Sequence, residues 1–257
     1  MSTHGEFYAR VFLQNDYSAV LNPKNHQCFD GLSAFVRRYS LGSQKCLEIG
    51  SGRGAFQDLV PNYTGVDVSE SVRSYYRKPF YCAPAESLPF EDSSFDAAWS
   101  CATLEHVEDP ERGMAEMRRV IKLGGVLYLE PAWQCRPWRC QGYPVRPYKD
   151  FDFLGKLIKA SIPIRDSLAF RSCYVFPRRL WGLVEAAIQR SPRPFRYRRL
   201  KANFDHFWMS DSDALNSMDP FDAILWFVSR GDKCLNYPSS WRQFWVRTGG
   251  LVFEIRK

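Results

Sequence analysis

Short apolar runs alternate with amphipathic stretches between residues 45 and 130, and this rhythm predicts a sheet flanked by helices. The runs resemble buried strands, and the stretches between them carry apolar residues three or four positions apart. Strands separated by helices pair in parallel, so the pattern predicts an α/β, doubly wound sheet with helices on both faces. The predicted strands are 45–49, 63–68, 80–83, 95–100 and 126–129.

The same periodicity predicts the helices and the end of the sheet. Asp109 and Asp219 are predicted N-caps, because each precedes a proline at the first helical position. Pro163 is predicted to end the helix before it. A short strand at 204–208 and an antiparallel last strand at 251–255 complete the prediction. The predicted helices are 26–38, 55–60, 70–77, 110–121, 150–161, 177–189 and 220–231.

These patterns divide the chain into four parts. Residues 1–44 form an N-terminal helical and aromatic extension, and residues 45–132 form the first part of the sheet. Residues 133–201 are rich in proline and arginine, and are predicted to be a helical insertion that covers the site. Residues 202–257 return to the sheet.

Charge is distributed unevenly along the chain. The formal net charge is +7, but residues 133–201 hold 16 Lys/Arg and four Asp/Glu, a local balance of +12. The rest of the chain therefore carries −5. A basic face of this kind attracts an anionic small molecule, nucleic acid or lipid headgroups, although a merely solvated surface has the same composition.

Composition narrows the class of protein further. No apolar run approaches the length of a membrane helix, and residues 1–12 lack the pattern of a secretory signal, so we expect a cytoplasmic protein. The eight cysteines form no Cys-x-x-Cys pair. They are interpreted as reduced core residues, as at Cys46, Cys82 and Cys101, and no metal site is predicted.

A glycine-rich turn follows the first strand in the order Glu48-Ile49-Gly50-Ser51-Gly52-Arg53-Gly54. Glycines at alternate positions allow unusual backbone angles and let a ligand approach the main chain. A tight turn without a ligand has the same pattern. The spacing Gly-x-Gly-x-Gly differs from the Gly-x-Gly-x-x-Gly of dinucleotide-binding proteins, which disfavours a nicotinamide-dependent oxidoreductase.

Asp67 ends the second strand, 17 residues after Gly50. An acid at this position can accept both ribose hydroxyls of a nucleoside. Its alternative role is to cap the helix that follows.

With these motifs in place, Lys45–Leu129 resembles the cofactor-binding half of class I S-adenosylmethionine-dependent methyltransferases. The likeness is to the small-molecule branch, similar to ubiquinone and sterol methyltransferases. The resemblance implies a Rossmann-like methyltransferase sheet and a cofactor-binding core over residues 45–132. The further segments that carry it are 85–90, 95–100, 103–110 and 123–127.

The resemblance also implies roles for single residues. Glu48 suits the ammonium of S-adenosylmethionine, and the main chain of Ala85 and Glu86 meets the adenine. Pro84 stands where the family often has an acid for the adenine amino group, which leaves adenine binding to the main chain and to stacking. The predicted cofactor-binding residues are Glu48, Gly50, Ser51, Gly52, Gly54, Asp67, Val68, Ala85, Glu86, Ser100 and Leu104.

Catalytic and acceptor residues are predicted next to this core. His106 follows the fourth strand and is the predicted general base for an alcohol acceptor, ahead of His26 and His206. Its alternative role is packing at a helix start. Aromatic and basic residues are predicted to bind the acceptor, a sugar-like or anionic group, or else simply to pack the insertion; these are Tyr8, Trp133, Arg136 and Tyr148.

The sequence therefore predicts methyl transfer from S-adenosylmethionine to a small-molecule or glycan acceptor, on oxygen. Three alternatives stay open: an RNA methyltransferase, an NAD-dependent oxidoreductase, and a non-catalytic protein that binds the cofactor. Nucleic acid is disfavoured as a partner because no separate RNA-binding module is visible. The sequence predicts no oligomeric state.

Overall fold

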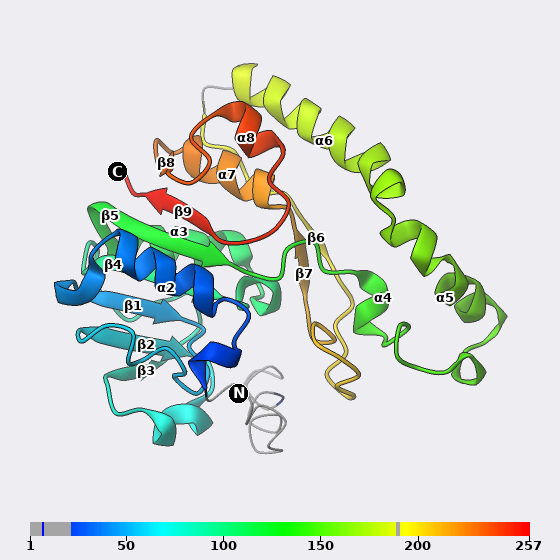
Figure 1. Cartoon of the computed structure of the whole chain (residues 1–257), viewed down its shortest axis with the longest axis horizontal. Helices are drawn as coiled ribbons and strands as arrows, with labels where there is room; N and C mark the ends of the chain where they lie inside the picture. The colour runs from blue at the N-terminus through cyan, green and yellow to red at the C-terminus, as the bar shows by residue number, and fades with distance from the viewer. Residues whose placement is uncertain (1–6, 8–21, 189–190) are drawn as a thin grey trace.

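The structure is a computed structural model that describes residues 7, 22–188 and 191–257. A sheet with the strand order β3-β2-β1-β4-β5-β9-β8 forms its body (Figure 1). The predicted sheet is confirmed, and the predicted strand bounds agree with those observed to within one residue except at β5. The strands are β1 Cys46–Ile49, β2 Tyr63–Asp67, β3 Phe80–Cys82, β4 Phe95–Cys101, β5 Ile121–Glu130, β8 Lys233–Cys234 and β9 Leu251–Glu254.

The first five strands are parallel, and β9 runs antiparallel between β5 and β8. The predicted antiparallel last strand is therefore confirmed. Strand order reverses at β1, whose neighbours are β2 and β4. In doubly wound sheets a crevice opens at the carboxyl ends of the strands beside such a reversal, and ligands bind there.

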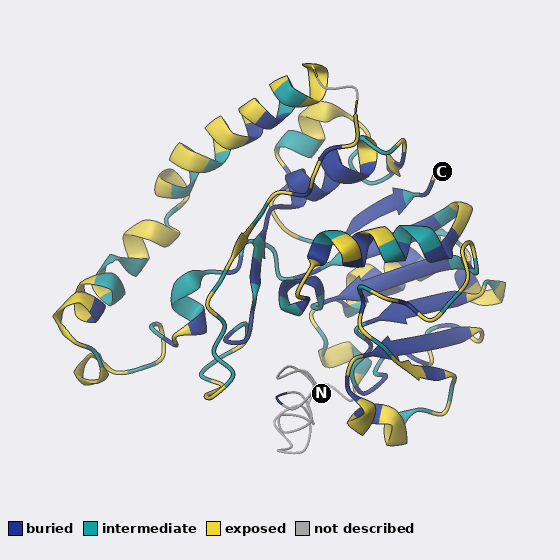
Figure 2. Cartoon of the chain, turned by 180° about the vertical axis from the view of Figure 1, so that it is seen from behind, coloured by how far each residue is buried: buried dark blue, intermediate teal, exposed yellow. Residues whose placement is uncertain are grey.

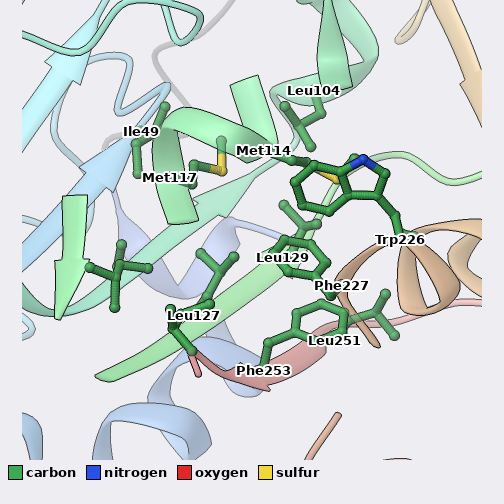
Figure 3. Packing of buried hydrophobic residues seen from close by; sticks show 14 of the residues in the cluster. Ile49, Leu104, Met114, Met117, Leu127, Leu129, Trp226, Phe227, Leu251 and Phe253 are labelled. Atoms are coloured by element: carbon green, nitrogen blue, oxygen red, sulfur yellow. The ribbon is translucent and has the colours of Figure 1, made fainter. Parts of the chain in front are cut away.

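Alternate residues of the strands pack on opposite faces of the sheet. Trp99 and its neighbours contact helix α2 (Phe29–Arg38) on one face. On the other face Ala98 and Leu127 pack beneath α3 (Pro110–Val120) and α7 (Pro220–Val228). Figure 3 shows this second layer, in which Met114 of α3 and Trp226 of α7 meet.

Both predicted N-caps are confirmed. The Asp109 side chain accepts a hydrogen bond from the Arg112 amide at 3.0 Å, and α3 begins at Pro110. The Asp219 side chain accepts one from the Phe221 amide at 2.9 Å, and α7 begins at Pro220. The capped amides have no partner within their own helix, so each carboxylate stabilises the helix start.

Three predicted elements are wrong. Residues 55–60 form turns. The Gln57 side chain donates a hydrogen bond to the Tyr75 carbonyl and accepts one from the Arg77 amide, and the six residues between Gly54 and Pro61 are too few for a stable helix. Residues 70–75 form a 3₁₀ helix, η4 (Glu70–Tyr75), where an α-helix was expected. Residues 204–208 are irregular, since the Asn203 side chain accepts hydrogen bonds from the amides of Asp205 and His206.

Short elements that the sequence did not indicate connect the larger ones. A two-stranded ribbon pairs β6 (Tyr197–Arg199) with β7 (Asn216–Met218). The remaining elements are η2 Pro23–Asn25, η3 Leu41–Ser43, η5 Leu104–His106, α4 Pro137–Cys140, η6 Tyr148–Asp150 and α8 Ser240–Phe244.

Two helices, α5 (Phe153–Asp166) and α6 (Leu168–Ile188), form an arm that extends away from the sheet (Figure 1). Pro163 was expected to end the first helix, but it lies inside α5, and Pro177 lies inside α6. A proline leaves one carbonyl of the preceding turn unpaired, and on an exposed arm water can bind that carbonyl.

Candidate functional site

A cavity of about 980 Å³ lies at the carboxyl ends of β1, β2 and β4, where the strand order reverses. This volume is at the upper end for a small-molecule or cofactor site. The lining residues that the structure describes come from 25–112 and 210–213. The predicted residues that line it are Glu48, Gly50, Ser51, Gly52, Asp67, Val68, Ala85, Glu86 and His106.

The glycine-rich turn forms one wall of the cavity. Glycine is required for different structural reasons at two of its positions, Gly50 and Gly52. Gly50 has φ +72°, and a Cβ there would meet the Thr103 hydroxyl oxygen at 2.1 Å, so this glycine lets the loop after β4 approach. Gly52 has φ +50°, and a Cβ there would meet no described atom within 4 Å. The main chain at Gly52 is therefore accessible to a ligand in the cavity.

Asp67 is held at the cavity by the turn that faces it. Its carboxylate accepts the Gly52 amide at 2.8 Å and the Ser69 amide at 3.0 Å. The second contact is local and precedes η4, whose N-cap position is Ser69, so Asp67 is not the N-cap of that helix. Ribose binding by Asp67 stays a prediction. Tyr76 fastens the turn from outside, since its hydroxyl donates to the Gly52 carbonyl at 2.8 Å.

Glu48 is a buried acid at the end of β1. Burial raises its pKa to about 8, and a hydrogen bond from the Tyr63 hydroxyl offsets part of that rise. Glu48 is therefore largely protonated at neutral pH in the protein alone. A cation placed beside it would stabilise the carboxylate, which makes this side of the cavity a site for a positively charged group.

The segment after β4 forms the opposite wall, and two other parts of the chain fix it. The Leu215 amide donates to the Glu105 carbonyl at 2.8 Å, and the Asn216 side chain donates to the Val107 carbonyl at 2.6 Å. The Ala132 amide donates to Glu105 Oε1 at 2.9 Å. Glu105 Oε2 accepts no hydrogen bond from any described residue, although the side chain is buried and lines the cavity.

His106 lies between two carboxylates. Its Nδ1 is 3.1 Å from Asp213 Oδ2, and its Nε2 is 3.8 Å from Glu105 Oε1. Burial lowers the pKa of His106, but the two carboxylates more than offset this and raise it to about 9. The imidazole is therefore a cation at neutral pH. Its predicted role as a general base stays a prediction.

Three predicted cofactor residues do not line the cavity. Leu104 points into the core toward Met114 and Trp226 (Figure 3). Ser100 is fully buried within β4. Gly54 backs onto the Tyr76 ring, which a Cβ would meet at 2.9 Å. All three support the walls from behind, and a contact with the cofactor remains a prediction.

The predicted acceptor residues lie elsewhere in the described structure. Trp133 donates to the Gly249 carbonyl at 2.9 Å, Arg136 pairs with Asp166 at 3.2 Å, and Tyr148 is exposed in η6. Tyr8 lies outside the described residues. Among the described residues of 133–201 none lines the cavity, so the covering role of this insertion also stays a prediction.

Carboxylates outnumber cations around the cavity, which disfavours the anionic acceptor that the basic insertion suggested. In the described part of the chain, eight acidic side chains line it, with two arginines and two histidines, His26 and His106. His206 stacks on Trp208 and is not among the lining residues. The acidic residues are Glu48, Asp67, Glu86, Glu105, Glu108, Asp109, Asp211 and Asp213.

Sequence reasoning did not identify Glu105 and Asp213 as candidates. Glu105 had a signal, because it adjoins His106 in the segment Thr103-Leu104-Glu105-His106 that follows β4. Asp213 had none, since it comes 107 residues after His106 and reaches it only through the contacts of Leu215 and Asn216.

Comparison with known proteins identifies the family of the part of the chain that forms most of the cavity. Residues 47–129 match a family model described as a methyltransferase domain. These residues hold the glycine turn, Asp67 and the segment after β4. Residues 47–129 form a class I, S-adenosylmethionine-dependent methyltransferase domain. The methyltransferase domain thus includes most of the cavity, and Asp211 and Asp213 from outside it complete one wall.

Individual relatives of the methyltransferase domain are distant. An uncharacterised protein of Methanocaldococcus jannaschii is 29% identical over 133 residues, which are 49% of this chain and 64% of that protein. A ubiquinone/menaquinone biosynthesis C-methyltransferase of Hahella chejuensis is 35% identical over 80 residues, or 31% of this chain and 32% of the enzyme.

A solved structure of a Thermotoga maritima S-adenosylmethionine-dependent methyltransferase is 27% identical, with a TM-score of 0.39, over 49% of this chain and 60% of that one. The chain thus spans less than two thirds of the length of the curated relatives described here.

Proposed function

We propose that the protein transfers a methyl group from S-adenosylmethionine to a hydroxyl oxygen of a small-molecule or saccharide acceptor. The observation that carries the proposal is the buried Glu105 carboxyl, which lines the cavity with Oε2 free of hydrogen bonds from described residues. An acceptor hydroxyl can donate to this oxygen, and alkylation of a hydroxyl needs such a proton acceptor.

The chemistry of the cavity residues supports this cofactor. Asp67 has carboxylate lone pairs for the ribose hydroxyls, and the main chain at Gly52 is open to a ligand. Glu48 would hold the ammonium group, and the main chain of Ala85 and Glu86 would meet the adenine. When bound, the cofactor supplies an electrophilic methyl group and its own leaving group.

The chain's own groups have a limited task. Glu105 orients the acceptor hydroxyl and takes its proton, and burial raises the pKa of Glu105 toward the range in which a carboxylate accepts protons well. His106, held as a cation beside Asp213, balances the negative charge at this wall. The walls align the acceptor with the methyl group and exclude water.

An amine acceptor is the second candidate, and the excess of lining carboxylates favours it. An ammonium group would be attracted to the wall formed by Glu105, Asp211 and Asp213. It would then lose its proton to one of these groups before methylation. Mass spectrometry of the methylated product distinguishes an O-methyl from an N-methyl group.

Calorimetric titration tests the cofactor first. S-adenosylmethionine and its demethylated product should bind, and NAD should not. Asp67→Ala removes a charged acceptor for the ribose, a loss of about 1.5–3 kcal/mol, so its Kd should rise roughly 10- to 150-fold. Unchanged affinity in a folded Asp67→Ala protein, or binding of NAD alone, would overturn the assignment.

A screen with isotopically labelled S-adenosylmethionine tests the acceptor and the base. In Glu105→Gln the side chain can still accept the hydrogen bond from the Ala132 amide, but it can no longer take a proton from the acceptor. Turnover should therefore fall at least about 100-fold, and the affinity for the cofactor should be unchanged. Glu108→Gln is the matched control at the same wall. If His106 were the base, turnover would instead rise with a midpoint near pH 9.

A further inference from the structure

The outer side of the α5–α6 arm is apolar and exposed. Figure 2 shows exposed residues along both helices, away from the sheet. The arm is attached through the second half of α6, where Gly182 packs against Phe221 and Leu225 of α7 and the buried Arg179 pairs with Asp219. This attachment orients one side of α6 toward the body and leaves the other side outward.

Six exposed residues of α6 form a stripe, and Leu168, Phe176 and Leu180 are exposed outside it. At 100° per residue the positions 170, 174, 177, 181, 184 and 188 fall within about 80° of the helix circumference. Trp181 is 60% exposed and Ile188 74% exposed. The stripe lies opposite the buried Arg179, as expected for an amphipathic helix whose apolar side faces away from the protein.

A second stripe continues this pattern on α5. Positions 153, 157, 160 and 164 fall within about 60° of its circumference. Phe153 is 78% exposed and Ile164 66% exposed. The structure places these side chains in solvent. Two consecutive exposed stripes of large apolar side chains indicate an interaction surface.

The charge of the arm is positive. It contains six basic and two acidic side chains, a balance of +4. Both acids are already paired with arginines outside the arm: Asp166 with Arg136, and Glu185 with Arg193. Lys156 and Arg165 are exposed on α5. A second copy of the chain would bring the same positive charge against this surface, so self-association is disfavoured.

We propose that the α5–α6 arm binds an anionic lipid membrane surface, with its apolar stripes in the headgroup–acyl boundary and the exposed Lys156 and Arg165 among the headgroups. A helix with an apolar face and a basic flank lies in the plane of such an interface. Over residues 22–188 and 191–257 no helix is both long and apolar enough to cross a bilayer. The arm therefore lies on the membrane, and its apolar stripes do not span it.

Flotation of the whole protein with lipid vesicles tests the proposal. We compare vesicles of phosphatidylcholine alone with vesicles that contain phosphatidylglycerol. Binding to the anionic vesicles should be at least tenfold stronger and should fall with added salt. The double variant Ile164→Ser/Trp181→Ser should bind the anionic vesicles at least tenfold more weakly, because each substitution removes a large apolar side chain from one of the stripes.

Leu123→Ser is the matched control, since Leu123 is 69% exposed on the body of the protein, and its vesicle binding should be unchanged. Far-UV circular dichroism and the Tm establish that each variant is folded. Failure to bind anionic vesicles, or full binding by the folded double variant, overturns the proposal. A concentration-dependent dimer that the double variant abolishes would also overturn it and assign the stripes to a second copy.

Discussion

At the residue scale, the proposed contact of Glu48 with the cofactor's ammonium predicts that cofactor affinity depends on pH. The Glu48 pKa of about 8 means that it is protonated at pH 6, whereas the cofactor's ammonium favours the carboxylate. Binding must then release a proton, so affinity should rise between pH 6 and pH 7.5, by at most about tenfold per pH unit. Calorimetry in buffers of different ionisation enthalpy counts the released proton.

Glu48→Gln is the control for this dependence. The amide oxygen can still accept the Tyr63 hydrogen bond, but the side chain no longer titrates. The variant should bind the cofactor more weakly than the unmodified protein does. Its affinity should not change with pH over this range. An unchanged slope in Glu48→Gln would show that another group releases the proton.

His106 gives a second prediction at this scale. Its pKa is raised above the ordinary value of 6.5 to about 9, so its pair with Asp213 stabilises the fold fully below about pH 6.5 and loses that effect as pH rises through about 9. Asp213→Asn removes the charge, and the pKa of His106 should fall. Titration of the imidazole by NMR measures this, and a pKa still near 9 would contradict it.

The residues predicted from the sequence were those in contiguous motifs. Gly50, Gly52 and Asp67 sit at the ends of strands, where strand geometry sends them to one edge of the sheet. Leu104 belongs to an equally clear motif but points into the core, because one turn of 3₁₀ helix, η5, directs it away from the cavity. A motif identifies the segment at the site, but not the direction of each side chain.

At the scale of elements, the two aspartate caps should differ greatly in their effect on stability. Asp219 is buried and also pairs with the buried Arg179, so Asp219→Ala leaves a buried charge unpaired. We expect a loss of about 3–5 kcal/mol in the free energy of unfolding. Asp109 is an exposed cap, and Asp109→Ala should cost about 1 kcal/mol.

Chemical denaturation of both variants measures the difference. Equal losses would mean that the Arg179 pair contributes nothing beyond the cap. The two caps look the same in the sequence, as an aspartate before a proline, and only the structure separates them. Likewise β6, β7 and β8 escaped prediction because strands of two or three residues are too short to show a period. The equally short β3 was predicted because it lies within the strand–helix alternation of residues 45–130.

At the scale of the whole molecule, β9 completes the sheet. It covers the edge of β5 and buries Leu251 and Phe253 fully. A chain shortened to end at Gly249 should therefore expose that edge and aggregate, whereas removal of Lys257 alone should leave the protein folded. The fraction recovered in the supernatant after expression measures both. A soluble, cooperatively unfolding product ending at Gly249 would contradict this role.

The pairing of β5 with β9 has a consequence for the order of events during synthesis. Val126 lies opposite Glu254, so the two partners emerge from the ribosome about 130 residues apart. At 5–20 residues per second this is a delay of roughly 6–25 s. During that interval the growing chain has an unpaired strand edge, and the apolar helices of the arm are already outside the tunnel. Chaperone demand should therefore persist until β9 has left the tunnel and paired with β5.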